Sequence, residues 1–142
     1  MKLLLPVDGT PASLAAVRHA PALRAQGLGA DYVLVNVQAP PSLYEVVTAH
    51  DAERIAQVRR EAGADQLAAA EALLSAAGAE WESEVAGGDP GHVLVELIEN
   101  YGCDGVVAGL DEGAPGPVAA ALLQHSPVPV TFVRAPEPAP EA

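Results

Sequence analysis

Hydrophobic and polar positions along the chain form two kinds of pattern. Short apolar runs of the length of buried strands occur at residues 3–7, 32–37, 106–109 and 128–133. Longer segments with apolar positions three or four residues apart, the spacing of amphipathic helices, occur at residues 11–26, 51–77, 90–101 and 118–125. Residues 80–85 alternate instead, which predicts one more strand that is half exposed. This alternation of strands and helices predicts an α/β fold, a single doubly wound five-stranded parallel sheet with helices on both faces.

Glutamates line one side of the alternating strand. Glu80, Glu82 and Glu84 share a face, and Trp81, Ser83 and Val85 lie on the other. Like charges along a strand are typical of a sheet edge that must not pair with another chain. We therefore interpret the three glutamates as a solvated face.

The ends of the predicted strands define a candidate ligand site. Asp8, Gly9 and Thr10 follow the first strand, Val37 ends the second, and a glycine-rich loop, residues 109–117, follows the fourth. Ligands of doubly wound sheets bind at the carboxyl ends of strands. A loop that leads into a helix also offers unpaired N–H groups to an anion.

Two of these residues have a structural alternative. Asp8 either contacts a nucleotide or caps the turn after the first strand by bonding N–H groups around Thr10. For Thr10, capping of the first helix is the favoured interpretation over phosphate binding. No nucleophile or partner carboxylate is placed beside His92, and we assign no catalytic residue and no metal site.

Composition restricts the classes of partner. The 142 residues fit one domain, residues 1–135, followed by a Pro/Glu-rich tail, residues 136–142, that we expect to be disordered. The net charge of −12 repels nucleic acid and anionic lipid, and no apolar run approaches the roughly 20 residues of a membrane span. Cys103 is the only cysteine, so we expect a cytoplasmic protein without disulfides.

Five segments in order resemble the universal stress protein family. They are residues 6–13 (PVDGTPAS), 33–37 (VLVNV), 88–90 (GDP), 103–109 (CDGVVAG) and 126–134 (SPVPVTFVR). The resemblance implies the strand order 3-2-1-4-5 and a homodimer joined through the last strands. An uncovered apolar edge strand needs a partner, and residues 128–133 carry no charge. We therefore place the dimer interface at Val128, Val130 and Phe132.

Family members that bind ATP resemble one another in a glycine motif after the fourth strand. Its pattern is Gly, two residues, Gly, nine residues, and Gly followed by Ser or Thr. Gly109 and Gly116 match the first and last glycines, but six residues separate them where the motif has twelve. Pro117 replaces the Ser or Thr and removes both a hydroxyl and an N–H donor. Asp8 and Val37 match family positions that contact the nucleoside.

These observations favour a non-catalytic, homodimeric stress-response or regulatory protein with weak or absent ATP binding and an unidentified protein partner. The alternative is an adenine-nucleotide-binding protein, for ATP or AMP, in which Gly113 and Gly116 offer N–H groups to a smaller anion such as the AMP phosphate. Slow ATP hydrolysis belongs to this alternative. A third candidate is a flavodoxin-like domain that binds a flavin.

Overall fold

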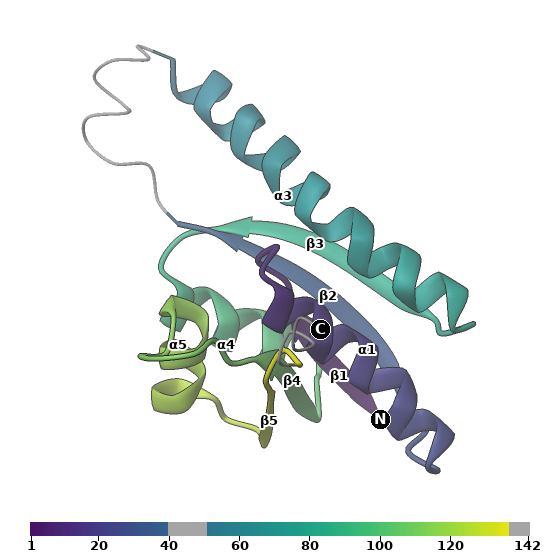
Figure 1. Cartoon of the computed structure of the whole chain (residues 1–142). Coiled ribbons are helices and arrows are strands. Elements are labelled where there is room, and N and C mark those ends of the chain that lie inside the picture. Colours follow the sequence, from purple (N-terminus) through teal and green to yellow (C-terminus); the bar gives the residue numbers. More distant parts are fainter. Residues whose placement is uncertain (40–50, 137–142) are drawn as a thin grey trace, which may run out of the picture.

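A five-stranded parallel sheet forms the centre of the molecule, in the order β3-β2-β1-β4-β5 (Figure 1). The computed structural model describes residues 1–39 and 51–136. The strands are β1 (Lys2–Pro6), β2 (Asp31–Gln38), β3 (Trp81–Gly87), β4 (Gly105–Gly109) and β5 (Val130–Val133). The helices are α1 (Pro11–Ala25), α3 (Ala52–Ala76), α4 (Pro90–Tyr101) and α5 (Pro117–His125). The predicted fold class and strand order are confirmed.

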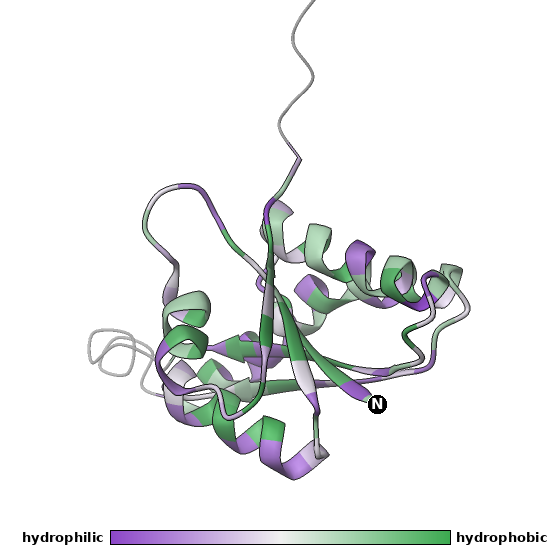
Figure 2. Cartoon of the chain, turned by 90° about the horizontal axis from the view of Figure 1, so that it is seen from below, coloured by the Kyte–Doolittle hydropathy of each residue, from purple (hydrophilic) through white to green (hydrophobic). Residues whose placement is uncertain are grey.

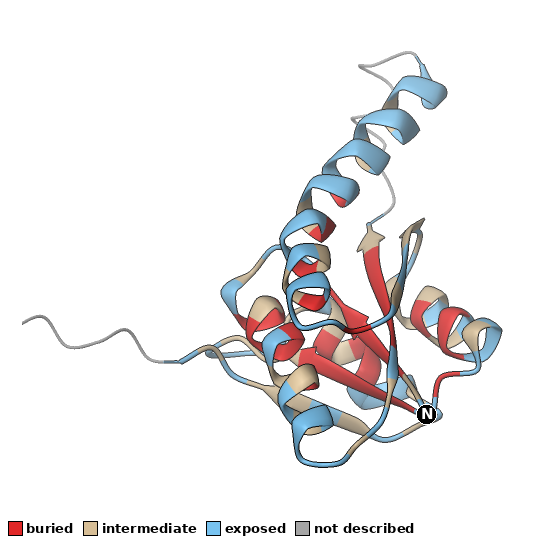
Figure 3. Cartoon of the chain, turned by 90° about the vertical axis from the view of Figure 1, so that its right-hand side faces the viewer, coloured by how far each residue is buried: buried red, intermediate tan, exposed pale blue. Residues whose placement is uncertain are grey.

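The two faces of the sheet carry two separate hydrophobic cores. Leu3 and Leu5 of β1 pack with α1 and α3, whereas Leu4 packs on the opposite face with α4 and α5. This division follows from the twofold periodicity of a strand, which sends neighbouring side chains to opposite faces. The central strands are buried along most of their length (Figure 3) and coloured as hydrophobic in Figure 2.

The last strand begins later than the hydrophobic pattern predicts. Val128 lies two residues before β5, in a turn where its N–H and C=O both bond the Ser126 hydroxyl, at 3.3 and 2.7 Å. The backbone of Val128 is therefore committed to the turn and not to the edge of the sheet. The placement of Val128 in the edge strand was wrong.

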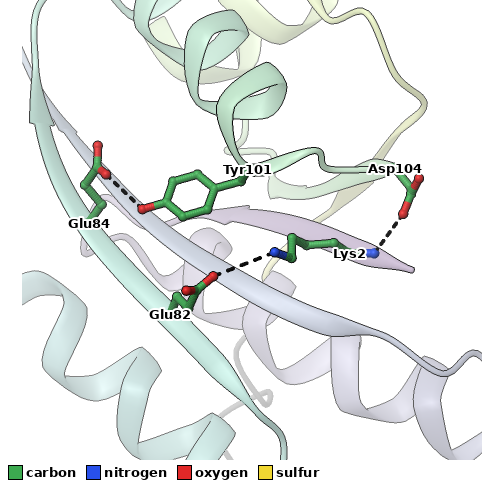
Figure 4. A network of polar contacts seen from close by, with 5 residues as sticks. All are labelled: Lys2, Glu82, Glu84, Tyr101 and Asp104. Carbon is green, nitrogen blue, oxygen red and sulfur yellow. Dashed lines mark hydrogen bonds and ion pairs between the residues drawn. The ribbon is translucent and has the colours of Figure 1, made fainter.

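The glutamate face of β3 is only partly solvated (Figure 4). Glu82 is exposed and lies 3.8 Å from the ammonium of Lys2. Glu84 is half-buried and accepts a 2.8 Å hydrogen bond from the Tyr101 hydroxyl of α4. The prediction of a fully solvated face was wrong for Glu84, because α4 brings a phenol over the strand.

The long helix α3 packs on the sheet through its C-terminal part only. Its buried residues are Gly63, Leu67, Ala70 and Leu74, whereas the turns before Gly63 are mostly exposed (Figure 3). Within residues 1–39 and 51–136, none of the helices combines the length and hydrophobicity that crossing a bilayer requires. Residues 137–142 of the expected tail lie outside the described residues.

Candidate functional site

A crevice lies where β1 and β4 end and α5 begins. Its volume is about 220 Å³, and its lining includes Asp8, Thr10, Gly109, Asp111 and Gly116. Four of the predicted site residues, from segments far apart in the sequence, therefore meet at one point of the sheet. The position agrees with the general rule that ligands of parallel sheets bind beyond the carboxyl ends of the strands.

A network of short hydrogen bonds holds the turn between β1 and α1. Asp8 Oδ1 accepts from the Thr10 N–H at 3.0 Å and from the Thr10 hydroxyl at 2.6 Å. The Thr10 hydroxyl oxygen in turn accepts from the Ser13 N–H at 3.2 Å, and the Ser13 hydroxyl donates to the Thr10 carbonyl at 3.0 Å. Asp8 and Thr10 thus have the capping roles that the turn chemistry predicts. The favoured interpretation of Thr10 as a helix cap is confirmed.

Gly109 has a packing role at the end of β4. A Cβ built on Gly109 would lie 2.4 Å from the Ala12 carbonyl carbon and 2.5 Å from the Ser13 nitrogen. No side chain fits there, so glycine lets β4 touch the first turn of α1. The close approach brings the loop after β4 next to Asp8.

The first turn of α5 offers few donors to an anion. Gly116 is its N-cap and makes no side-chain capping bond, and Pro117, its first residue, has no N–H. The first intrahelical bond joins the Ala120 N–H to the Gly116 carbonyl at 2.9 Å. The N–H groups of Val118 and Ala119 precede that bond, and both residues line the crevice.

The electrostatics of the crevice disfavour a polyphosphate. Asp8 and Asp111 both line it, and the described residues of its wall include no lysine or arginine. Asp111 Oδ2 lies 3.9 Å from the position of a Cβ on Gly116, beside the helix start. Negative charge at the N-terminus of α5 competes with an anionic ligand for the same positive end of the helix dipole.

Three predicted site residues do not line the crevice. Gly9 contacts Gln66 of α3, since a Cβ there would lie 3.3 Å from Gln66 Cγ. Val37 is half-buried and packs into the core under α4 and α5. Gly113 has a left-handed φ of 84° in the loop before α5. Local sequence patterns do not show which residues at the strand ends turn toward one space.

A buried amide behind the crevice was missed by the sequence reasoning. Asn36 is 1 % exposed, and its Nδ2 donates to the Val7 carbonyl at 2.8 Å and to Gln66 Oε1 at 2.6 Å. It therefore holds the residue before Asp8 against α3. The available signal was a polar residue inside the apolar run 32–37.

On the side of β5 that faces away from β4, the strand presents backbone N–H and C=O groups. The carbonyls of Pro129 and Val133 accept from the N–H groups of Val106 and Leu110 on β4, at 2.9 and 2.8 Å. Alternate residues of a parallel strand face the same neighbour, so Thr131 also faces β4. Val130 and Phe132 direct their N–H and C=O groups away from β4, while their side chains pack into the core under α4 and α5.

Side chains with catalytic potential lie elsewhere. His92 is exposed, and its Nε2 lies 3.8 Å from Glu96 on the same helix. Cys103 is buried, and this burial raises the pKa of its thiol. Among the described residues no group of three or more His, Cys, Asp or Glu side chains could hold a metal ion.

Comparison with known proteins identifies related sequences and folds. The model of the universal stress protein family matches residues 1–134. A universal stress protein family member from Burkholderia pseudomallei is 23 % identical with a TM-score of 0.73, over 93 % of this chain and 94 % of that one. A family protein from Arabidopsis thaliana with AMP bound is 18 % identical with a TM-score of 0.72, over 96 % and 92 % of the chains. The universal stress protein from Archaeoglobus fulgidus in complex with dAMP is 18 % identical with a TM-score of 0.66, over 94 % and 97 %. No curated protein matches the chain.

Proposed function

This chain belongs to the universal stress protein family, and we propose that it is a non-catalytic, homodimeric stress-response or regulatory protein that binds ATP weakly or not at all. The observation that carries the proposal is the composition of the crevice between β1, β4 and α5. It combines two carboxylates with a helix start that lacks a hydroxyl and one N–H.

Three properties of the crevice argue against tight triphosphate binding. Asp8 and Asp111 repel a ligand with several negative charges. Pro117 has neither a hydroxyl nor an N–H to donate, at the position where the resemblance to the family's ATP-binding motif implies Ser or Thr. The loop from Gly109 to Gly116 has six intervening residues, which leaves little backbone to surround three phosphates.

The non-catalytic part of the proposal rests on the hydroxyl groups nearest the crevice. Thr10 and Ser13 are both engaged in capping α1, where each hydroxyl makes a bond within the turn. Neither has a histidine partner among its described hydrogen bonds, so neither has the base that activates a serine or threonine nucleophile.

The homodimer is proposed on the geometry of β5. Val130 and Phe132 present paired donors and acceptors at the edge of the sheet, and no charged residue occurs between Val130 and Val133. A second copy of β5 in antiparallel orientation would satisfy these groups by extending the sheet across the two protomers.

A second candidate function is binding of an adenine monophosphate. The N–H groups of Val118 and Ala119 are available before the first intrahelical bond of α5, and two donors suit one phosphate better than three. The related structures from Arabidopsis thaliana and Archaeoglobus fulgidus hold AMP and dAMP. These ligands are therefore the first to test.

Calorimetric titration separates the two candidates. We expect Mg-ATP to give no saturable heat at micromolar concentration, and AMP to bind more tightly than ATP if the second candidate holds. Asp111→Asn should strengthen the binding of either nucleotide, by about fivefold, because it removes one repulsive charge. Glu112→Gln, in the same loop but outside the crevice lining, is the matched control. Micromolar binding of Mg-ATP to the unaltered protein would contradict the leading proposal.

A further inference from the structure

An open groove lies between the N-terminal half of α3 and the ends of β2 and β3, and its α3 residues are exposed or half-buried. Gly63 marks the closest approach of α3 to the sheet, since a Cβ there would lie 2.6 Å from Val85 Cγ1 and 2.8 Å from Asn36 Oδ1. Before Gly63 the helix runs past the ends of β2 and β3 (Figures 1 and 3). Helix and strand ends border an open cavity of about 480 Å³ there. Small-molecule sites commonly have volumes of about 300–1,000 Å³.

The walls of this groove are mainly apolar. Ala52, Ile55 and Ala56 of α3 line it at the spacing of one helix face. Val85 and Ala86, near the end of β3, line the opposite side. The small side chains leave room between helix and strand. Their apolar surfaces favour an apolar ligand, because binding removes the surfaces of both the ligand and the groove from water.

The described lining of the groove is basic, in contrast to the acidic chain as a whole. Arg59 and Arg60, two of only seven basic residues in a chain with nineteen acidic ones, are among its lining residues. Arg59 Nη1 donates to the Ala39 carbonyl at 2.6 Å, which fixes this side chain over the end of β2. The described residues that line the groove include no carboxylate. The exposed Arg60 therefore attracts a negatively charged ligand, in contrast to the crevice with Asp8 and Asp111.

We propose that this groove binds a free amphipathic carboxylate, meaning an apolar chain or ring system that carries one carboxylate. The apolar part contacts Ile55, Ala56 and Val85, and the carboxylate pairs with the exposed guanidinium of Arg60. A guanidinium matches a carboxylate with two parallel donors, which gives both charge and geometric selectivity. This site is separate from the nucleotide crevice and does not depend on the proposed function.

A displacement assay on the full chain tests the proposal. The dye anilinonaphthalenesulfonate, an apolar anion, should bind saturably, and decanoate should displace it at one equivalent per chain. Decyltrimethylammonium, with the same tail and the opposite charge, should displace it much less effectively. Equal displacement by the two amphiphiles would mean that the groove selects only for hydrophobicity, and would overturn the proposal. Absence of saturable displacement by decanoate would overturn it too.

Paired variants locate the binding. Ala56→Trp fills the groove and should abolish decanoate binding, whereas Ala68→Trp, at an exposed alanine of the same helix, should change it less than about twofold. Arg60→Gln should weaken decanoate by about fivefold, as expected for a partly solvated ion pair, and Arg54→Gln should not. The arginine pair still tests the proposal if the tryptophan variants fold poorly, because both arginines are exposed.

Two further outcomes would show the proposal to be wrong. Equal effects of Ala56→Trp and Ala68→Trp, or of Arg60→Gln and Arg54→Gln, would place the ligand outside the groove. Loss of AMP binding without loss of decanoate binding would concern the proposed function alone.

Discussion

The two edge strands of the sheet, β3 and β5, differ in the charge of the side chains beside their exposed backbones. β3 is seven residues long and carries Glu82 and Glu84, which lie near Lys2 and Tyr101 (Figure 4). β5 is four residues long and has the sequence VTFV, without a charge. Charged side chains on an edge strand discourage pairing with another chain. The difference supports the proposal that a second protomer pairs with β5 and not with β3.

Side chains of each edge strand contact the helices that cover the sheet. On β5, the partly buried side chains of Val130 and Phe132 pack against the core under α4 and α5, while their backbone groups remain at the edge. On β3, the Tyr101 hydroxyl of α4 bonds Glu84. A preorganised edge loses less conformational entropy when it pairs, which favours association through β5.

The largest effect is expected from a proline at the outward edge of β5. Val130→Pro removes an N–H that points away from β4 and leaves the β4 ladder intact, so we expect the dimer to be lost and the native mass to halve. Light scattering measures the mass, and circular dichroism verifies the fold.

Two controls separate the backbone effect from the side-chain effect. Val130→Ala shortens the side chain and keeps the N–H, and should remain dimeric. Thr131→Pro removes an N–H that faces β4, and should destabilise the fold by about 1–3 kcal/mol, as expected for a lost buried hydrogen bond. A dimer unchanged by Val130→Pro would place the interface on another surface.

The next effect concerns the protection of β3. Replacing Glu80 and Glu82 by valine removes two exposed charges next to an open strand edge, and we expect association beyond the dimer that increases with concentration. Sedimentation velocity measures the distribution of species. The same two substitutions at Glu96 and Glu99, exposed on α4, add equal hydrophobicity without a strand edge. If both double variants associate equally, surface hydrophobicity and not the edge is responsible.

The sequence predicted the architecture well because the fold depends on periodicity. The apolar runs and helical spacings map onto the nine described helices and strands, with the ends of most of them shifted by one or two residues. Those shifts have local causes, such as the Ser126 hydroxyl that occupies the backbone of Val128.

The sequence predicted the crevice less completely because its geometry depends on distant partners. Asn36 and Gln66 lie 30 positions apart, and no local pattern indicates that their amides meet. The direction of Val37, toward the core and not the crevice, follows from how β2 sits over α4 and α5. Glu84 was misjudged for the same reason, since Tyr101 reaches it from another element.

The smallest effect is expected from the Tyr101–Glu84 hydrogen bond on β3. Tyr101→Phe should lower the free energy of unfolding by about 1 kcal/mol at neutral pH, because one half-buried hydrogen bond is lost. The bond to Glu84, followed by burial, raises the pKa of Tyr101 to about 12. A phenol whose pKa is raised in the folded state stabilises the protein fully below its unfolded pKa of about 10. This contribution is lost as the pH rises toward 12, so the difference between the unaltered protein and Tyr101→Phe should shrink across this window.

Urea denaturation at several pH values measures this difference in the free energy of unfolding. Burial also raises the pKa of Tyr32, but both proteins contain Tyr32, so its effect cancels. Glu84→Gln keeps an acceptor oxygen and should lose less stability than Tyr101→Phe. A difference that stays constant from pH 10 to 12 would contradict the raised pKa of Tyr101, and no difference at neutral pH would show that the hydrogen bond to Glu84 does not stabilise the fold.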